Sequence, residues 1–345
     1  SRIVADQLVK LIKEADHVVI MGHRMSDLDA IGSAEGVLRI CKICDVPAVI
    51  AVRRDATLAG SLINALIAAG QEDDFIDPKG ALPIISQRTL CIVVDTYQLG
   101  LVESREILEK CGKVAVIDHH RKGVGFIEKA DLVCHEPYAS SASELVTEFL
   151  QYVGDRDDKP NRIEAEGLLS GIMLDTRDFT LHTGVRTFEA AAALRRYGAE
   201  TEHVRQLFDV SMVEYTTKAT LVSEAQMYRG CAITVSGEVA PEARVAIAQA
   251  ANDLLTIQNV EASFVAVQVG GGVNISARSL GAVNVQVIME SLGGGGHQTM
   301  AAAQLKHITP EAVRSRIQTA IDQYREAQKK RGLESESEQK KKDKQ

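Results

Sequence analysis

A short apolar run that ends in three titratable residues constrains this chain more than any other stretch. Residues 114–117 read Val-Ala-Val-Ile, and Asp118, His119 and His120 follow at once. Four apolar residues, three of them β-branched, are typical of a buried strand in a parallel sheet. Ligands of open α/β sheets bind at the carboxyl ends of such strands. The sequence therefore predicts that these three residues lie in a functional site. On this stretch alone, a strand that ends in an ordinary polar loop is the alternative.

The first part of the chain alternates strand and helix patterns. The predicted strands are residues 17–21, 48–52, 90–94, 114–117 and 132–134. Segments with helical periodicity separate most of them, and such alternation predicts a parallel, doubly wound sheet with helices on both faces. Ser141 precedes Glu144 by three residues, which is a capping-box spacing at the start of a predicted helix.

The second part of the chain has a different pattern. The glycine turn at 270–272 joins two predicted strands, which indicates a hairpin and a partly antiparallel sheet. We therefore predict an α/β protein with two domains. The predicted segments are a parallel, doubly wound domain at 1–195, a helical connector at 196–228, a smaller mixed-sheet α/β domain at 229–328 and a disordered tail at 329–345.

Composition limits the partners. The net charge is −8, Trp is absent and aromatic residues make up 4% of the chain. Long nucleic acids usually need a basic surface with stacking platforms, so we expect no long nucleic-acid partner. Neither a long apolar segment nor a signal peptide is present, so we expect no membrane contact by this segment and a cytoplasmic location. A membrane anchor in a longer parent chain would not be visible in this sequence.

Polar residues follow several of the predicted buried elements. The set is His23, Asp27, Asp29, Asp95, Asp118, His119, His120 and Asp175. Five carboxylates and three imidazoles at four element ends are difficult to explain as independent caps. Mixed carboxylate and imidazole ligands without cysteine favour Mn²⁺, with Co²⁺ or Fe²⁺ as substitutes. Two ions ~3.5–4 Å apart would activate a bridging water and hold the oxygens of a phosphoryl displacement. The predicted reaction is phosphoester hydrolysis.

The second domain contains residue types that bind phosphate. Residues 293–296 are four glycines, whose backbone can approach an anion closely, and His297 follows them. Arg278 ends a predicted strand, and its guanidinium binds phosphate in a fixed fork. A flexible linker is the alternative explanation for the glycines alone.

Several of these motifs resemble a known family. Gly22-His23 with Asp27 and Asp29, Val94-Asp95-Thr96, Asp118-His119-His120 and Leu174-Asp175-Thr176 resemble the successive motifs of the DHH phosphoesterase superfamily. Residues 275–280 and 293–297 are similar to its DHHA1 partner domain. The stretches at 136–146, 278–286 and 293–299 resemble most closely the catalytic region of GdpP-type cyclic-di-AMP phosphodiesterases. The ending after His297 lacks the final glycine of the common DHHA1 pattern.

The resemblance implies a role for each candidate. One Mn²⁺ would be held by His23, Asp27 and Asp95, and the other by Asp29, Asp95, His119 and Asp175, with Asp95 bridging. Asp118 would orient a ligand histidine, and His120 would face the scissile phosphate. The remaining substrate contacts would come from Ser141, Arg278, Gly294, Gly295, Gly296 and His297.

The implied activity is hydrolysis of cyclic-di-AMP to linear 5′-pApA by attack of a metal-bridging hydroxide on phosphorus. One alternative is a nanoRNase or RecJ-like enzyme that clears short oligonucleotides or pApA. A pyrophosphatase of the same superfamily is a more distant alternative, which the glycine-histidine loop does not suit. A non-catalytic sensor of cyclic dinucleotides is an alternative of another class. The resemblance is also compatible with a homodimer.

Overall fold

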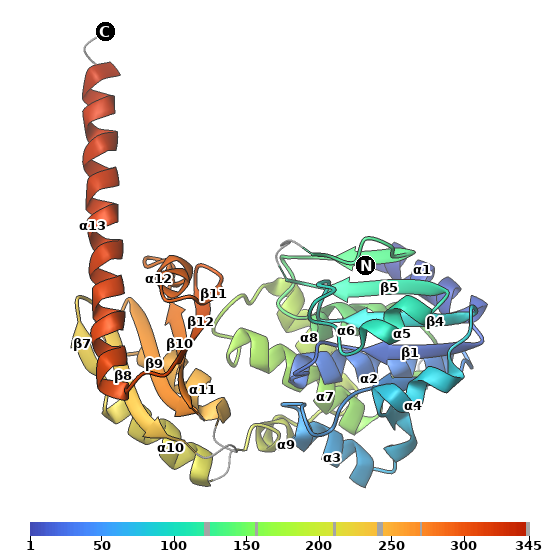
Figure 1. Cartoon of the computed structure of the whole chain (residues 1–345). Helices are drawn as coiled ribbons and strands as arrows, with labels where there is room; N and C mark the ends of the chain where they lie inside the picture. The colour runs from blue at the N-terminus through green and yellow to red at the C-terminus, as the bar shows by residue number, and fades with distance from the viewer. Residues whose placement is uncertain (121–124, 156–157, 210–211, 240–243, 270, 343–345) are drawn as a thin grey trace. The chain divides into compact units, whose positions relative to one another are not determined.

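The computed structural model describes residues 1–345 except 121–124, 156–157, 210–211, 240–243, 270 and 343–345. The chain forms two compact units, residues 1–209 and 210–345. Each unit is described by itself (Figure 1).

Unit 1 contains a parallel sheet of six strands in the order β3-β2-β1-β4-β5-β6. The strands are β1 (His17–Met21), β2 (Ala48–Ala51), β3 (Phe75–Ile76), β4 (Thr89–Val94), β5 (Lys113–Asp118) and β6 (Leu132–His135). The helices are α1 (Arg2–Glu14), α2 (Leu28–Ile43), α3 (Gly60–Ala68), α4 (Pro78–Ala81), α5 (Arg105–Lys110), α6 (Ala142–Tyr152), α7 (Arg162–Thr176), α8 (Val185–Arg196) and α9 (Thr201–Gln206), with short 3₁₀ turns η1 (Glu72–Asp74) and η2 (Leu82–Ile84). The predicted parallel α/β sheet is confirmed.

Both faces of this sheet are buried, which explains why its strands are apolar throughout. Along β1, Val18 and Ile20 pack into the core with α2, α6 and α7, while Val19 packs into the core on the opposite face. A strand with two buried faces needs apolar residues at every position instead of every second one. The chain leaves β1 toward β2 on one side and β4 toward β5 on the other, so the topological switch point of the sheet lies between β1 and β4, and ligands of such sheets bind at the carboxyl ends there.

Unit 2 contains a mixed sheet in the order β11-β12-β10-β9-β8-β7. Its elements are α10 (Met212–Ser223), β7 (Gln226–Tyr228), β8 (Cys231–Glu238), α11 (Arg244–Leu254), β9 (Ala262–Val269), β10 (Gly272–Ser279), α12 (Val285–Ser291), β11 (Gly295–Gly296), β12 (Met300–Lys306) and α13 (Pro310–Lys342). The pairing of β8 with β9 is parallel and that of β9 with β10 antiparallel, so the predicted mixed sheet and its hairpin are confirmed. One residue of the predicted glycine turn, Gly270, lies outside the described residues.

The segment predicted as a connector is divided between the two units. Val204 of α9 is buried in the core of unit 1, and Leu221 of α10 is buried in unit 2 beside Ala232 and Val265. Both short helices therefore contribute to cores. The helix α13 continues to Lys342, and disorder of residues 329–345 stays a prediction.

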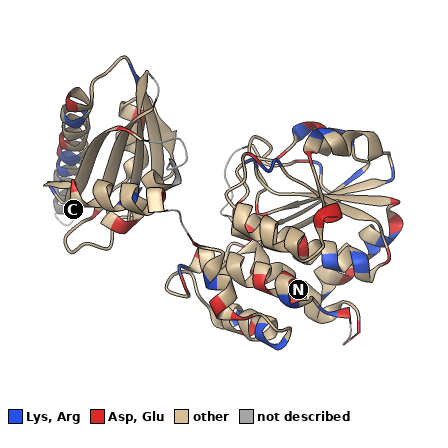
Figure 2. Cartoon of the chain, turned by 90° about the horizontal axis from the view of Figure 1, so that it is seen from below, with Lys and Arg blue, Asp and Glu red and all other residues tan. Residues whose placement is uncertain are grey.

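No helix in the described part of the chain combines the length and the apolar character needed to span a membrane. Figure 2 shows acidic and basic residues interspersed on the helices of residues 1–209.

A buried carboxyl group lies on α2. Glu35 is fully buried, and neither of its carboxyl oxygens has a hydrogen-bond partner among the described residues. Burial, with the nearby charges of Asp74 and Glu164, raises the pKa of Glu35 to about 8. The folded state therefore favours the neutral acid, and the unfolded chain releases the proton near its ordinary pKa.

The raised pKa of Glu35 predicts that the free energy of unfolding depends on pH. Because the folded pKa is raised, the stabilising contribution of neutral Glu35 is complete below about pH 4.5 and is lost as pH rises through about 8. Glu35→Gln should match the parent near pH 5 and exceed it near pH 9 by on the order of 3 kcal/mol in the free energy of unfolding. Urea unfolding at both pH values measures this, with exposed Glu202→Gln as the control. Equal stability of parent and Glu35→Gln at pH 9 would contradict it.

Candidate metal centre

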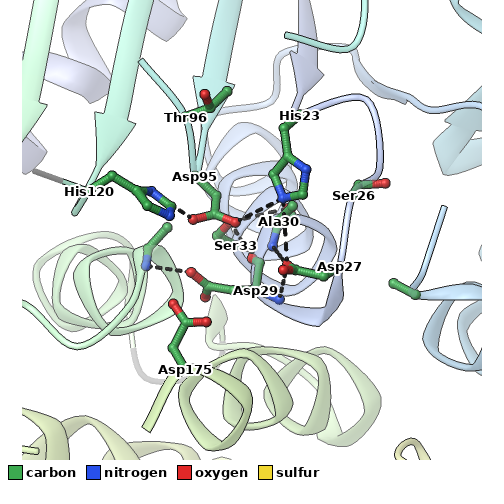
Figure 3. A network of polar contacts seen from close by, with 12 residues as sticks. His23, Ser26, Asp27, Asp29, Ala30, Ser33, Asp95, Thr96, His120 and Asp175 are labelled. Carbon is green, nitrogen blue, oxygen red and sulfur yellow. Dashed lines mark hydrogen bonds and ion pairs between the residues drawn. The ribbon is translucent and has the colours of Figure 1, made fainter. Parts of the chain in front are cut away.

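Acidic and histidine side chains gather at the carboxyl ends of β1 and β4 (Figure 3). His23 follows β1, and Asp95 is the first residue after β4. Asp27 and Asp29 lie at the start of α2, and Asp175 lies in the last turn of α7. His119 and His120 follow β5, the strand next to β4. The topology of the sheet therefore brings residues that are up to 152 positions apart in sequence to one place.

Asp95 is the central residue of this group. Its Oδ2 lies 3.4 Å from Nε2 of His23, and its Oδ1 lies 3.4 Å from Nε2 of His119. Its backbone has φ of 57°, a left-handed conformation that is uncommon for a residue with a side chain. The Asp95 N–H donates to the carbonyl of Ile117 at 2.9 Å, which ties this bend to β5. A strained backbone at this position is typical of a functional site.

Three overlapping groups of side chains could each hold a metal ion. Within each group the ligand atoms lie within 4.8 Å of one another. The groups are His23, Asp27 and Asp95; Asp29, Asp95, His119 and Asp175; and Asp95, His119 and His120. Asp95 belongs to all three. The first two groups have the same members as the ligand sets that the family resemblance implies.

Helix ends position two of the acidic residues. Asp27 caps α2, since its Oδ1 accepts from the N–H groups of Asp29 and Ala30 at 3.0 and 3.1 Å. Asp29 is fully buried and accepts from the N–H groups of Ala142 and Ser143 at 2.7 and 2.8 Å. These two donors belong to the first turn of α6, whose partial positive charge stabilises a carboxylate.

A glycine that the sequence did not single out makes room for Asp29. A Cβ atom on Gly171 would lie 2.3 Å from Oγ of Ser143 and 2.6 Å from Oδ1 of Asp29. Gly171 lies on α7, one turn before Asp175. Only the packing of α7 against α2 and α6 reveals its role, because a glycine inside a helical pattern carries no such signal in sequence.

The charges in the centre shift the pKa values of both residue types. Burial lowers the pKa of His23, but its contacts with Asp27 and Asp95 raise it to about 10. In the same way the pKa of His119 rises to about 12, despite burial, because Asp175 and Asp95 face it. Burial would raise the pKa of Asp95, but the nearby rings of His119 and His23 hold it below its ordinary value.

Asp29 and Asp175 show the opposite shift. Burial, together with the charges of Asp95 and Asp175, raises the pKa of Asp29. Burial raises the pKa of Asp175 to about 6, although the contact with His119 opposes it. So many carboxylates in one buried place need positive charge, which protons on the histidines or divalent cations can supply.

Two atoms at the middle of the centre favour divalent cations as the source of this positive charge. Oδ1 of Asp95 and Nε2 of His119 are buried and have no hydrogen-bond partner within the part of the chain that the structure describes. Buried polar atoms are nearly always satisfied, so exceptions of this kind point to a missing ion or water. Both are preferred ligand atoms of divalent transition metals. The residues present therefore fit one or more divalent metal ions.

The carboxylate of Asp118 contacts the ring of His120. Its Oδ1 lies 2.8 Å from Nδ1 of His120 and accepts from the backbone N–H of His119 at 2.9 Å. The family resemblance implied that Asp118 orients a ligand histidine; the ring that it contacts is that of His120, a member of one of the three ligand-atom groups, and the role of Asp118 stays a prediction. The contact is local, because the chain turns around the Asp118 carboxylate after β5 and places the second following residue over it.

The remaining candidate in unit 1, Ser141, is the N-cap of α6. Its buried hydroxyl accepts from the N–H of Glu144 at 3.0 Å, in agreement with the capping pattern in the sequence. Glu144 does not return the bond to Ser141 but binds Ser140 and Thr187. A substrate contact by Ser141 stays a prediction.

The candidates of unit 2 gather at one end of its sheet. Arg278 pairs with Met300 in the register of β10 and β12, and Gly296 pairs with Ala301. A Cβ atom on Gly294 would lie 2.1 Å from the carbonyl oxygen of Ala302, so the glycine run packs closely against β12. The chain then turns at His297, which is exposed. The run is part of the fold and not a linker, and substrate binding by Arg278, Gly294, Gly295, Gly296 and His297 stays a prediction.

Comparison with known proteins agrees with this architecture. Residues 17–172 match the DHH family, N-terminal domain, and residues 239–328 match the DHHA1 domain. The chain is 45% identical to the cyclic-di-AMP phosphodiesterase GdpP of Geobacillus thermodenitrificans, covering 95% of this chain and 51% of that protein. It is 40% identical to the cyclic-di-AMP phosphodiesterase PdeA of Listeria monocytogenes, covering 94% of this chain and 50% of that protein.

The chain thus spans about half the length of these curated relatives. Among solved structures, an exopolyphosphatase-related protein from Bacteroides fragilis has the same fold, with a TM-score of 0.79 at 21% identity over 95% of this chain and 98% of that one. Two matched domains in the expected order, together with these relatives, show that the chain belongs to the DHH family and carries a DHH domain followed by a DHHA1 domain.

Proposed function

We propose that this chain is a phosphodiesterase that hydrolyses cyclic-di-AMP to linear 5′-pApA. The observation that carries the proposal is the position of Asp95, which is shared by three groups of metal-ligand atoms at the switch point of the sheet. Such an arrangement suits two ions that share one carboxylate. The substrate is proposed from the relatives, whose names give cyclic-di-AMP phosphodiesterase activity.

In this proposal the residues of unit 1 would hold two metal ions. One ion would be held by His23, Asp27 and Asp95, and the other by Asp29, Asp95, His119 and Asp175. Divalent ions bound there would supply an activated water and neutralise charge on the phosphate. We propose Mn²⁺, because mixed imidazole and carboxylate ligands favour it, with Co²⁺ or Fe²⁺ as substitutes.

His120 is the residue proposed to act on the substrate. Its side chain is 54% exposed, and its ring is oriented by the buried carboxylate of Asp118. Burial lowers the pKa of His120, but the contacts with Asp118 and Asp95 raise it overall above its ordinary value. A protonated imidazole can attract the scissile phosphate and donate a proton to the departing 3′ oxygen.

The remaining assignments follow from the same comparison. The DHHA1 unit would bind the rest of the dinucleotide through Arg278, the glycine run and His297. We also propose a cytoplasmic location, with which six unpaired cysteines agree.

The test is turnover of cyclic-di-AMP beside pApA with Mn²⁺ present. We expect loss of the cyclic substrate with accumulation of pApA, and no turnover after the metal is chelated. Consumption of pApA to AMP with the cyclic form nearly untouched would instead indicate an enzyme that clears short oligonucleotides. Binding of the cyclic form without turnover of either substrate would indicate a sensor.

A further inference from the structure

A cavity of about 710 Å³ in unit 1 lies between two loops that also support the metal centre. One loop contains Tyr138 and leads into α6, whose first N–H groups hold Asp29. The other loop follows Asp175 at the end of α7 and leads into α8. The cavity is lined by Pro137, Tyr138, Ala139, Phe179, Thr180, His182, Thr183, Gly184 and Phe188. None of the metal-ligand candidates lines it.

Aromatic rings are concentrated around this cavity. The whole chain has seven Tyr, seven Phe and no Trp, yet Tyr138, Phe179 and Phe188 all line it. The rings of Phe179 and Phe188 are stacked, with centroids 5.7 Å apart and planes 17° from parallel. Tyr138 is 94% exposed and Phe188 57% exposed. Exposed aromatic faces beside a concave site are typical of ligand binding.

The backbone that carries Phe179 is held in an unusual conformation. Arg177, Asp178 and Phe179 all have φ between 47° and 62°, in the left-handed region. Thr176, which is buried, fixes them: its carbonyl accepts from the N–H groups of Thr180 and Leu181 at 2.8 and 2.7 Å, and its hydroxyl accepts from Phe179 at 2.9 Å. Consecutive non-glycine residues in this region cost energy, which is usual where a loop shape serves a site.

The charge of the lining decides the kind of ligand. Among the described residues, the lining contains neither Lys nor Arg, and its polar side chains are two threonines, a tyrosine and a histidine. Such a surface gives a phosphate no countercharge but offers flat apolar faces with hydrogen-bonding groups beside them. A nucleobase matches it, because every base has a π face that stacks on aromatic side chains, and purines stack more strongly than pyrimidines.

We propose that this cavity binds one purine base of the substrate, which stacks on Tyr138 and Phe188 while the attached phosphate lies at the metal centre. The inference rests on the proposed function, since it takes the substrate to be a purine dinucleotide. It makes the two rings substrate-positioning residues of the DHH unit.

The test compares steady-state kinetics on cyclic-di-AMP. Tyr138→Ala and Phe188→Ala should each raise KM by about 10-fold or more and change kcat far less, because a stacking contact contributes to binding. Tyr138→Phe keeps the ring and should retain the parent KM. Tyr152→Ala removes another exposed tyrosine, at the far end of α6 outside the cavity, and is the matched control. Unchanged KM in both alanine variants, or a fall in kcat alone, would overturn the proposal.

A second measurement separates this proposal from the proposed function. If the parent chain does not turn over cyclic-di-AMP, calorimetric titration with 5′-AMP decides the matter. Weaker binding of 5′-AMP by Tyr138→Ala, with the parent affinity kept in Tyr138→Phe, would support the cavity as a base site even though the substrate is another nucleotide. Equal affinities in the parent and both alanine variants would overturn it.

Discussion

Asp95→Ala is expected to lower turnover of cyclic-di-AMP by roughly 10³-fold or more. Asp95 is the one residue common to all three groups of ligand atoms, so its loss disturbs every metal position at once. Metal ions contribute several kcal/mol of transition-state stabilisation, and about 4 kcal/mol corresponds to about 10³ in rate. Calorimetric titration with Mn²⁺ should show the loss of tight sites in parallel with the loss of activity.

A control variant and a folding measurement test whether the loss of activity is specific to Asp95. The exposed acid Asp73 lies on η1, away from the centre, and Asp73→Asn should keep full activity and metal affinity. Circular dichroism and thermal unfolding check that Asp95→Ala is folded, since Asp95 is buried and its backbone is left-handed. Activity within a few-fold of the parent would show that the centre does not need a shared carboxylate, and the two-ion arrangement would have to be abandoned.

The sequence could predict that these side chains lie together because the fold places strand ends together, while their roles stay predictions. In a parallel sheet all carboxyl ends lie at one edge, so finding Asp95 and Asp118 directly after apolar runs was enough to expect them near each other. The same reasoning placed His23 beside them. Residue type and position at an element end thus carried most of the information about the metal centre.

What the sequence missed depends on packing and on local turns. The pairing of Asp118 with the ring of His120 follows from how the chain bends after β5, which residue order alone does not fix. The support of Asp29 by α6 joins residues 113 positions apart. The aromatic cavity is assembled from two loops, and isolated Tyr and Phe residues in loops have no periodic pattern that would reveal it.

Gly171→Ala is expected to reduce Mn²⁺ affinity by about 10- to 100-fold and to reduce turnover with it, as is usual when the support of a metal ligand is disturbed. Helix propensity alone predicts the opposite, since Ala is favoured over Gly inside a helix by about 1 kcal/mol. The added methyl group would lie 2.6 Å from Oδ1 of Asp29 and 2.3 Å from Oγ of Ser143. The helices α2, α6 and α7 are buried at this contact, so the added methyl group can be accommodated only if Asp29 shifts.

The same substitution at Gly60 provides the matched control for Gly171→Ala. Gly60 begins α3, and no atom lies within 4 Å of the position that an added methyl group would take, so Gly60→Ala should keep full metal affinity and activity. Thermal unfolding separates a local from a global effect. A Gly171→Ala protein that is stable but binds Mn²⁺ weakly would show that close packing of α7 on α2 sets the position of Asp29. A stable Gly171→Ala protein that binds Mn²⁺ with the affinity of the parent would contradict the prediction. It would show that a shift of Asp29 does not affect metal binding.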